Sequence, residues 1–137
     1  MEPRSLKWPL ADGTTKKWLH DPTRKALLAN TARAGKIDPT TFDAIYFTDV
    51  HRVMHDFPDD PDLQRITRET YEAGGIVLAV SHGHCGLLNT TLSNGAWLIA
   101  GRRLTGYSWI EEMFAGVAGK VPYNAENNIQ ERSMKRG

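Results

Sequence analysis

Two short apolar runs separated by a helix-forming segment constrain the fold of this chain most. Residues 44–47 (Ala-Ile-Tyr-Phe) and 76–80 (Ile-Val-Leu-Ala-Val) have the length and continuous apolar character of buried strands. Between them, Asp60-Pro61 is an N-cap followed by proline at the first helical position, and Gly74-Gly75 ends the helix. Strand, helix and strand in this order predict a βαβ unit with a parallel sheet and a right-handed crossover, and therefore an α/β fold.

The length of 137 residues predicts one domain over residues 1–137, and its other segments give weaker signals. Residues 1–20 are expected to form an irregular surface segment. Further helices are predicted from Asp21-Pro22 to about residue 31, from the capping-box pattern at Ser108 to about residue 118, and over 126–136. Short strands are predicted at 97–100, 103–105 and 121–122.

Composition excludes several classes of function. The formal net charge of +1 provides no long-range field to recruit nucleic acid or an anionic membrane. No apolar stretch approaches the roughly 18 residues of a membrane span, and the first residues lack the apolar core of a signal peptide. The single cysteine, Cys85, excludes an intrachain disulfide and suits a reducing compartment. We therefore expect a soluble, cytoplasmic protein without a nucleic-acid or membrane partner.

Two loops rich in imidazole follow the predicted strands. The loop after Phe47 carries His51 and His55, and the loop after Val80 carries Ser81, His82, His84 and Cys85. In an open α/β sheet the loops beyond the carboxyl ends of neighbouring strands converge, so we expect these side chains in one pocket. A hydroxyl at the end of a buried strand, followed closely by glycine, is also typical of a nucleophile elbow.

Residues 42–124 resemble the ThiJ/PfpI superfamily, also called class I glutamine amidotransferase-like, and most closely its chaperone-like glyoxalase branch. Residues 49–58 (DVHRVMHDFP) match that branch's GGHGVMWDFP, and 79–84 (AVSHGH) match its AVCHGP. Four further segments follow the family pattern in order, at 87–89, 92–95, 100–108 and 121–123. The resemblance implies a flavodoxin-like three-layer sandwich with a mostly parallel sheet.

The same resemblance implies a set of site residues and no cofactor. Ser81 stands where the family has its cysteine nucleophile, His82 is the adjacent histidine, and Glu112 aligns with the acid. Val50, His51 and Gly83 fall at the implied oxyanion and pocket positions. A serine is far less acidic than a thiol, and the loop before the site has lost its glycines, so impaired catalysis is expected.

Three functions stay open at this point. The first is a non-catalytic or oligomeric module, and the second is a residual glyoxalase or hydrolase that acts on a small carbonyl compound through Ser81 and His82. The third is zinc binding through His51, His55, His82, His84 and Cys85. Compared with the family pattern, the chain lacks a first strand-helix-strand and a final strand-helix. The exposed sheet edges expected from this predict a homodimer or higher oligomer.

Overall fold

The computed structural model describes residues 12–48 and 51–134 of the 137-residue chain. The chain divides into two compact units, Met1–Arg33 and Ala34–Gly137. The second unit contains the sheet and every described candidate site residue. The assignment of residues 1–137 to one domain stays a prediction.

The first unit contains two short helices, α1 (Gly13–His20) and α2 (Pro22–Ala29). Helix α2 begins as predicted, because the Asp21 carboxylate accepts hydrogen bonds from the backbone of the first turn at 2.9 and 3.3 Å. The prediction of an irregular segment was wrong for Gly13–His20. There the Asp12 carboxylate accepts a bond of 2.7 Å from the N–H of Thr15, so Asp12 caps a helix. The rest of that predicted segment, residues 1–11, lies outside the described residues.

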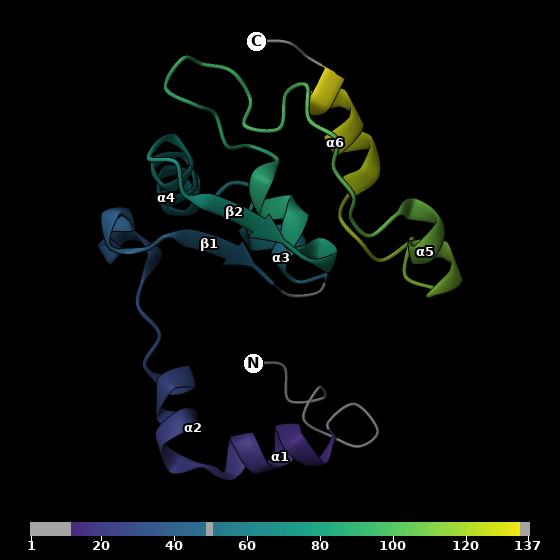
Figure 1. Ribbon diagram of the computed structural model, residues 1–137. Helices are drawn as coiled ribbons and strands as arrows, with labels where there is room; N and C mark the ends of the chain where they lie inside the picture. Colours follow the sequence, from purple (N-terminus) through teal and green to yellow (C-terminus); the bar gives the residue numbers. More distant parts are fainter. Residues whose placement is uncertain (1–11, 49–50, 135–137) are drawn as a thin grey trace. The chain divides into compact units, whose positions relative to one another are not determined.

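The second unit is built on the predicted βαβ unit, which is confirmed. Strands β1 (Ala44–Phe47) and β2 (Ile76–Ala79) pair in parallel, with Ala44 opposite Ile76. Helix α4 (Pro61–Glu72) connects them (Figure 1). The Asp60 carboxylate caps this helix with bonds of 2.8 and 3.0 Å, as the cap-then-proline signal predicted.

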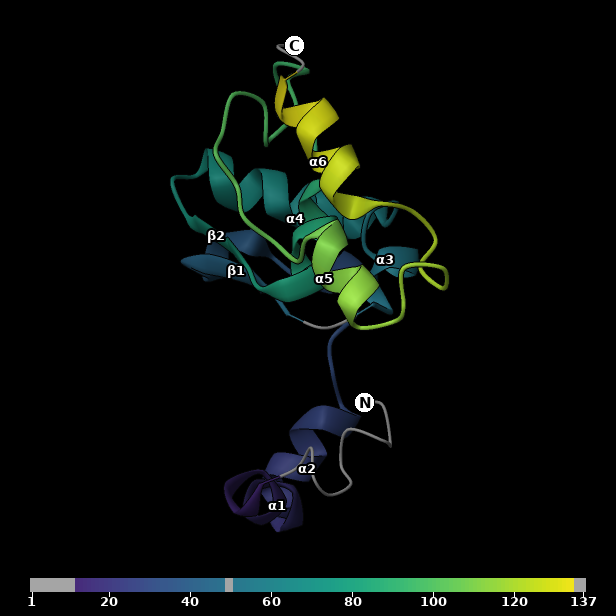
Figure 2. The same cartoon turned by 90° about the vertical axis from the view of Figure 1, so that its right-hand side faces the viewer.

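The core lies against one face of this two-stranded sheet. Ile45, Phe47 and Val77 point into it, whereas Tyr46 and Leu78 on the opposite face are 57% and 47% exposed. The helices of this unit lie on the core side, and among the residues described no helix of the unit covers the other face (Figure 2). The buried apolar residues of the core cluster are Phe47, Met54, Cys85, Leu87, Leu88, Leu98, Ile99 and Ala125.

Helical segments fill the rest of the second unit. They comprise α3 (Val53–Asp56), α5 (Trp109–Phe114), α6 (Ala125–Met134) and three short 3-10 helices, η2 (Ala34–Lys36), η3 (Pro39–Thr41) and η4 (Ser81–Leu87). The predicted capping box is confirmed: Ser108 and Glu111 exchange hydrogen bonds at the start of α5. No helix within the described ranges has the length and apolar character needed to cross a membrane.

The three short strands predicted after residue 95 were wrong. Trp97 makes an isolated antiparallel bridge with Thr91. The backbone after Trp97 forms turns: the N–H of Ala100 donates to the carbonyl of Trp97 at 3.0 Å. The N–H of Gly101 donates to the carbonyl of Ser133 in helix α6 at 2.8 Å. Residues 103–105 and 121–122 are likewise irregular. Apolar side chains favoured strands here, but no neighbouring strand within residues 12–48 and 51–134 is placed to complete a ladder.

Candidate active site

Ser81 lies where β2 turns into η4, and its backbone is strained. Its φ of 52° makes it the one non-glycine residue with a positive φ among those described. For an L-residue this left-handed conformation costs about 1–2 kcal/mol. Such strain on a hydroxyl residue between a strand and a helical turn is the geometry of a nucleophile elbow.

Two glycines let η4 approach the end of β1 closely. A Cβ on Gly83 would lie 2.3 Å from the carbonyl oxygen of Phe47, and one on Gly86 would lie 2.7 Å from the Phe47 ring. Neither position has room for a side chain, so the turn that carries Ser81 and His82 is fixed against the strand.

His84 holds the backbone of the elbow in place. Its Nδ1 lies 2.5 Å from the carbonyl oxygen of Ser81, and because a carbonyl can only accept, Nδ1 carries the proton. Burial lowers the pKa of the His84 imidazole, which favours the neutral ring. His84 therefore acts on Ser81 through the main chain, as a structural anchor.

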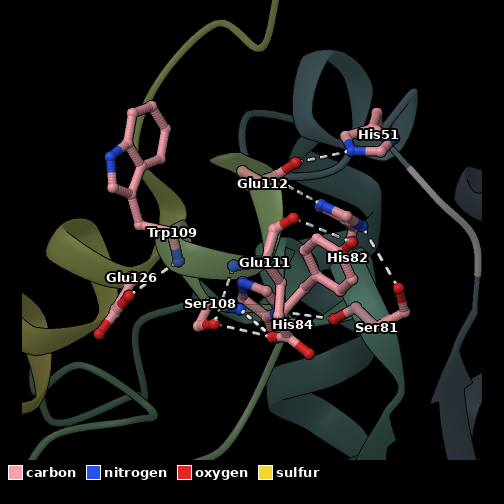
Figure 3. A network of polar contacts seen from close by, with 10 residues as sticks. His51, Ser81, His82, His84, Ser108, Trp109, Glu111, Glu112 and Glu126 are labelled. Atoms are coloured by element: carbon pink, nitrogen blue, oxygen red, sulfur yellow. Dashed lines mark hydrogen bonds and ion pairs between the residues drawn. The ribbon is translucent and has the colours of Figure 1, made fainter. Parts of the chain in front are cut away.

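His82, the other histidine of the turn, connects Ser81 to the buried carboxylate of Glu112. His82 Nδ1 lies 3.3 Å from Ser81 Oγ, and His82 Nε2 lies 2.6 Å from Oε1 of Glu112 (Figure 3). The side chains of His82 and Glu112 are only 2% and 5% exposed. The structure thus brings together the three residues that the resemblance implied, in the order hydroxyl, imidazole, carboxylate.

The Glu112 carboxylate has a second imidazole partner. Its Oε2 lies 2.8 Å from Nε2 of His51, which comes from the loop after β1 and is 38% exposed (Figure 3). Burial raises the pKa of Glu112, but the hydrogen bonds from His82 and His51 outweigh this effect and leave it below its ordinary value. Glu112 is therefore ionised at neutral pH.

Tyr107 completes the wall of the site, and sequence reasoning did not find it. Its ring centroid lies 4.7 Å from that of His82 and 6.2 Å from that of His51. The only signal in the sequence was its place in a segment that matches the family pattern, residues 100–108, with no chemistry to single it out.

Gly83, one of the implied oxyanion positions, does not provide a free donor in this structure. The backbone N–H of Gly83 donates to the carbonyl of Val80 at 2.9 Å, so it is not free to donate to a reacting oxygen. The prediction for Gly83 is therefore corrected to a packing role against Phe47. Val50 lies outside the described residues.

The predicted five-residue zinc site is not assembled. His51 precedes α3, which begins at Val53, so His51 and His55 do not share a helical face, and His55 is exposed. His84 is bonded to the main chain of Ser81. Cys85 is fully buried, and burial raises the pKa of its thiol, so that the thiolate needed for metal binding is disfavoured.

Several known proteins are similar to this chain in sequence or in fold. No protein-family model matches the chain. It is 35% identical to glyoxalase 3 of Candida albicans over 111 residues. The matched region covers 80% of this chain and 47% of that protein.

Two solved structures share the fold. The rapid encystment protein of 24 kDa from Francisella tularensis superposes with a TM-score of 0.88 and 28% identity, over 100% of this chain and 60% of that one. Glyoxalase III of Candida albicans superposes with a TM-score of 0.85 and 26% identity, over 96% and 58% of the two chains. The chain belongs to the ThiJ/PfpI superfamily. This ThiJ/PfpI chain has the predicted α/β, flavodoxin-like fold and spans about half the length of the curated relatives it matches.

Proposed function

We propose that this ThiJ/PfpI chain is an enzyme of glyoxalase type in which Ser81 is the nucleophile that attacks a small carbonyl compound. The observation that carries the proposal is the continuous hydrogen-bonded line from Ser81 through His82 to Glu112. A serine needs such a line more than a cysteine does, because its hydroxyl must lose a proton of high pKa as it attacks.

The geometry supports a defined path for that proton. The ionised Glu112 accepts the Nε2–H of His82, which leaves the Nδ1 lone pair directed at Ser81 Oγ. As Oγ forms its bond to the carbonyl carbon, the hydroxyl proton passes to Nδ1, and Glu112 stabilises the resulting imidazolium. The carbonyl π pair moves to oxygen, which takes the proton from the His82 imidazolium and returns the ring to its neutral state. An aldehyde becomes a hemiacetal without any external oxidant or cofactor.

The substrate class proposed is a small 2-oxoaldehyde. The support is the relationship to proteins named glyoxalase 3 and glutathione-independent glyoxalase, from Candida albicans and Saccharomyces cerevisiae. Because the chain spans about half the length of these relatives, their activity comes to it only as a proposal.

The decisive experiment combines turnover with covalent trapping. Methylglyoxal consumption is measured for the wild type, Ser81→Ala, Ser81→Cys and a matched control, Ser133→Ala, whose hydroxyl bonds only to its own helix at Gln130. We expect loss of turnover in Ser81→Ala, a gain in Ser81→Cys, and no change in Ser133→Ala. A fluorophosphonate probe should modify Ser81, as located by mass spectrometry. The proposal would be overturned if the wild type and Ser81→Cys are both folded, yet neither consumes methylglyoxal nor reacts with the probe.

A second candidate, a non-catalytic oligomeric module, is favoured by one observation. The sheet face away from the core exposes large apolar side chains, at fractions of 47–58%: Tyr46, Ile76, Leu78 and Val80. Contiguous apolar surface of this kind is typical of an interface, and we propose a second copy of the chain as the occupant. Light scattering should give a dimer for the wild type and a monomer for Leu78→Lys. A wild type that is monomeric at tens of micromolar contradicts it. A cytoplasmic location stays a prediction.

A further inference from the structure

His51 has a role that the reaction at Ser81 does not explain. The line from Ser81 through His82 to Glu112 uses one carboxylate oxygen, Oε1, whereas His51 Nε2 lies 2.8 Å from the other oxygen, Oε2. Two imidazole nitrogens from different parts of the chain therefore converge on one buried carboxylate. Their three ligand atoms all lie within 4.8 Å of one another. Among the described residues, no other group of three or more histidine, cysteine or acidic side chains is as closely spaced.

We propose that His51, His82 and Glu112 form a binding site for a divalent transition-metal ion, with zinc as the first candidate. Two imidazole nitrogens and one carboxylate oxygen are a ligand set of catalytic zinc sites, which keep a further position open. This set replaces the five-residue set expected from sequence, with which it shares only His51 and His82. It also goes beyond the proposed function, which uses no metal.

The distances fit an ion after a small adjustment. Zinc binds imidazole nitrogen and carboxylate oxygen at about 2.0–2.2 Å, so two ligand atoms on one ion lie at most about 4 Å apart. The ligand atoms here span up to 4.8 Å, while the hydrogen-bonded pairs are at 2.6 and 2.8 Å. The ion requires the 2.6 and 2.8 Å contacts to lengthen and the widest separation to shorten by about 1 Å, which takes a shift of the partly exposed His51 and a rotation of the Glu112 carboxylate.

The surroundings provide both support and access. His82 and Glu112 are buried, which limits their movement to small rotations, whereas His51 is 38% exposed and leaves a path for the ion and a water molecule. The Tyr107 ring packs against both imidazoles. Ser81 Oγ, 3.3 Å from His82 Nδ1, can accept the Nδ1–H, which is the outer hydrogen bond that orients a metal-binding histidine.

Metal binding and attack by Ser81 require opposite states of His82. An ion on Nε2 takes the place of the Nε2–H that Glu112 accepts, and the neutral ring then carries its one proton on Nδ1 instead. His82 then donates to Ser81 Oγ and cannot take its proton. A bound ion therefore prevents activation of the Ser81 hydroxyl as a nucleophile. The metal is an inhibitor of the proposed reaction.

The test is zinc titration of the untagged full chain after treatment with a chelator, in competition with a chromogenic chelator. We expect one equivalent of Zn²⁺, and affinity lowered by more than about tenfold in His51→Ala and in Glu112→Gln. His55→Ala is the matched control, because His55 is an exposed neighbouring histidine outside the site, and Cys85→Ser tests the thiol. Both should bind as the wild type does. Circular dichroism verifies that each variant is folded.

The outcome separates this proposal from the proposed function. Ser81→Ala should lose activity and still take up one equivalent of zinc, since Ser81 is not a ligand, although loss of its hydrogen bond to His82 weakens the affinity. An inactive wild type therefore leaves the metal site testable. Absence of stoichiometric uptake by the folded wild type would overturn the site. So would unchanged affinity in folded His51→Ala, or a loss of affinity in His55→Ala or Cys85→Ser.

Discussion

His82 and Glu112, which are 30 residues apart in the chain, are joined by a buried hydrogen bond of 2.6 Å between Nε2 and Oε1. The bond links the turn after β2 to the first turn of α5, so it ties the two halves of the site together. It also sets which nitrogen of His82 faces Ser81. The orientation of the imidazole therefore depends on a residue from a different element.

Glu112→Gln should keep the shape of the site but lose its charge. An amide can still contact Nε2, yet it cannot stabilise an imidazolium as a carboxylate does, so we expect fluorophosphonate labelling of Ser81 to slow by at least about a hundredfold. Glu111→Gln is the adjacent control, since Glu111 caps α5 and does not contact His82 through its carboxylate. Equal labelling rates in Glu112→Gln and wild type would mean that Glu112 has no part in activating Ser81.

The conformation of Ser81 predicts a stabilising substitution that abolishes activity. Glycine adopts a φ of 52° without strain, so Ser81→Gly should unfold at a higher urea concentration than Ser81→Ala, by about 0.5–1 kcal/mol in free energy. Both variants lack the hydroxyl, and the comparison therefore isolates the backbone. An alanine variant as stable as the glycine variant would show that the positive φ is not maintained in solution.

The close contact of η4 with β1 predicts a large effect from a single methyl group. Gly83→Ala places Cβ 2.3 Å from the backbone oxygen of Phe47, which cannot move without disturbing the sheet, and we expect a loss of about 1–3 kcal/mol in unfolding free energy. Gly119→Ala is the matched control, because a Cβ there meets nothing within 4 Å. Chemical denaturation of the two variants measures the difference, and similar values for both would contradict the packing described.

The central βαβ unit was predictable because its signals are local. The cap at Asp60 and the apolar runs before and after it act within a few residues, and no distant partner is needed to interpret them. The strands expected over 97–105 failed for the opposite reason. A strand exists only with a neighbour, and here the backbone bonds to turns and to helix α6 instead.

The site was predictable only in part, for a related reason. Ser81 and His82 are adjacent in sequence, and Glu112 came from the family resemblance. The bond between His51 and Glu112 joins residues 61 positions apart, and no spacing rule covers such a pair. The failed zinc set shows the same limit, since the separation of His51 and His55 suggested a helical face that the chain does not form.

A carboxylate that links the end of α4 to the loop after η4 predicts a dependence of stability on pH. Glu72 accepts hydrogen bonds from the backbone N–H and the hydroxyl of Ser93 at 2.6 and 2.7 Å, and these hold the pKa of Glu72 below its ordinary value. A carboxyl whose folded-state pKa is lowered stabilises the fold above its unfolded pKa, about 4.3, and this contribution is lost as the pH falls through the folded value.

Glu72→Gln should therefore be less stable than the wild type at pH 7, and the gap should close as the pH drops below about 4. A double-mutant cycle with Ser93→Ala isolates the pair, since the coupling should be present at pH 7 and absent in acid. Thermal unfolding followed by circular dichroism at both pH values measures it. A coupling that stays constant between pH 7 and acid would show that the charge of Glu72 does not contribute through Ser93.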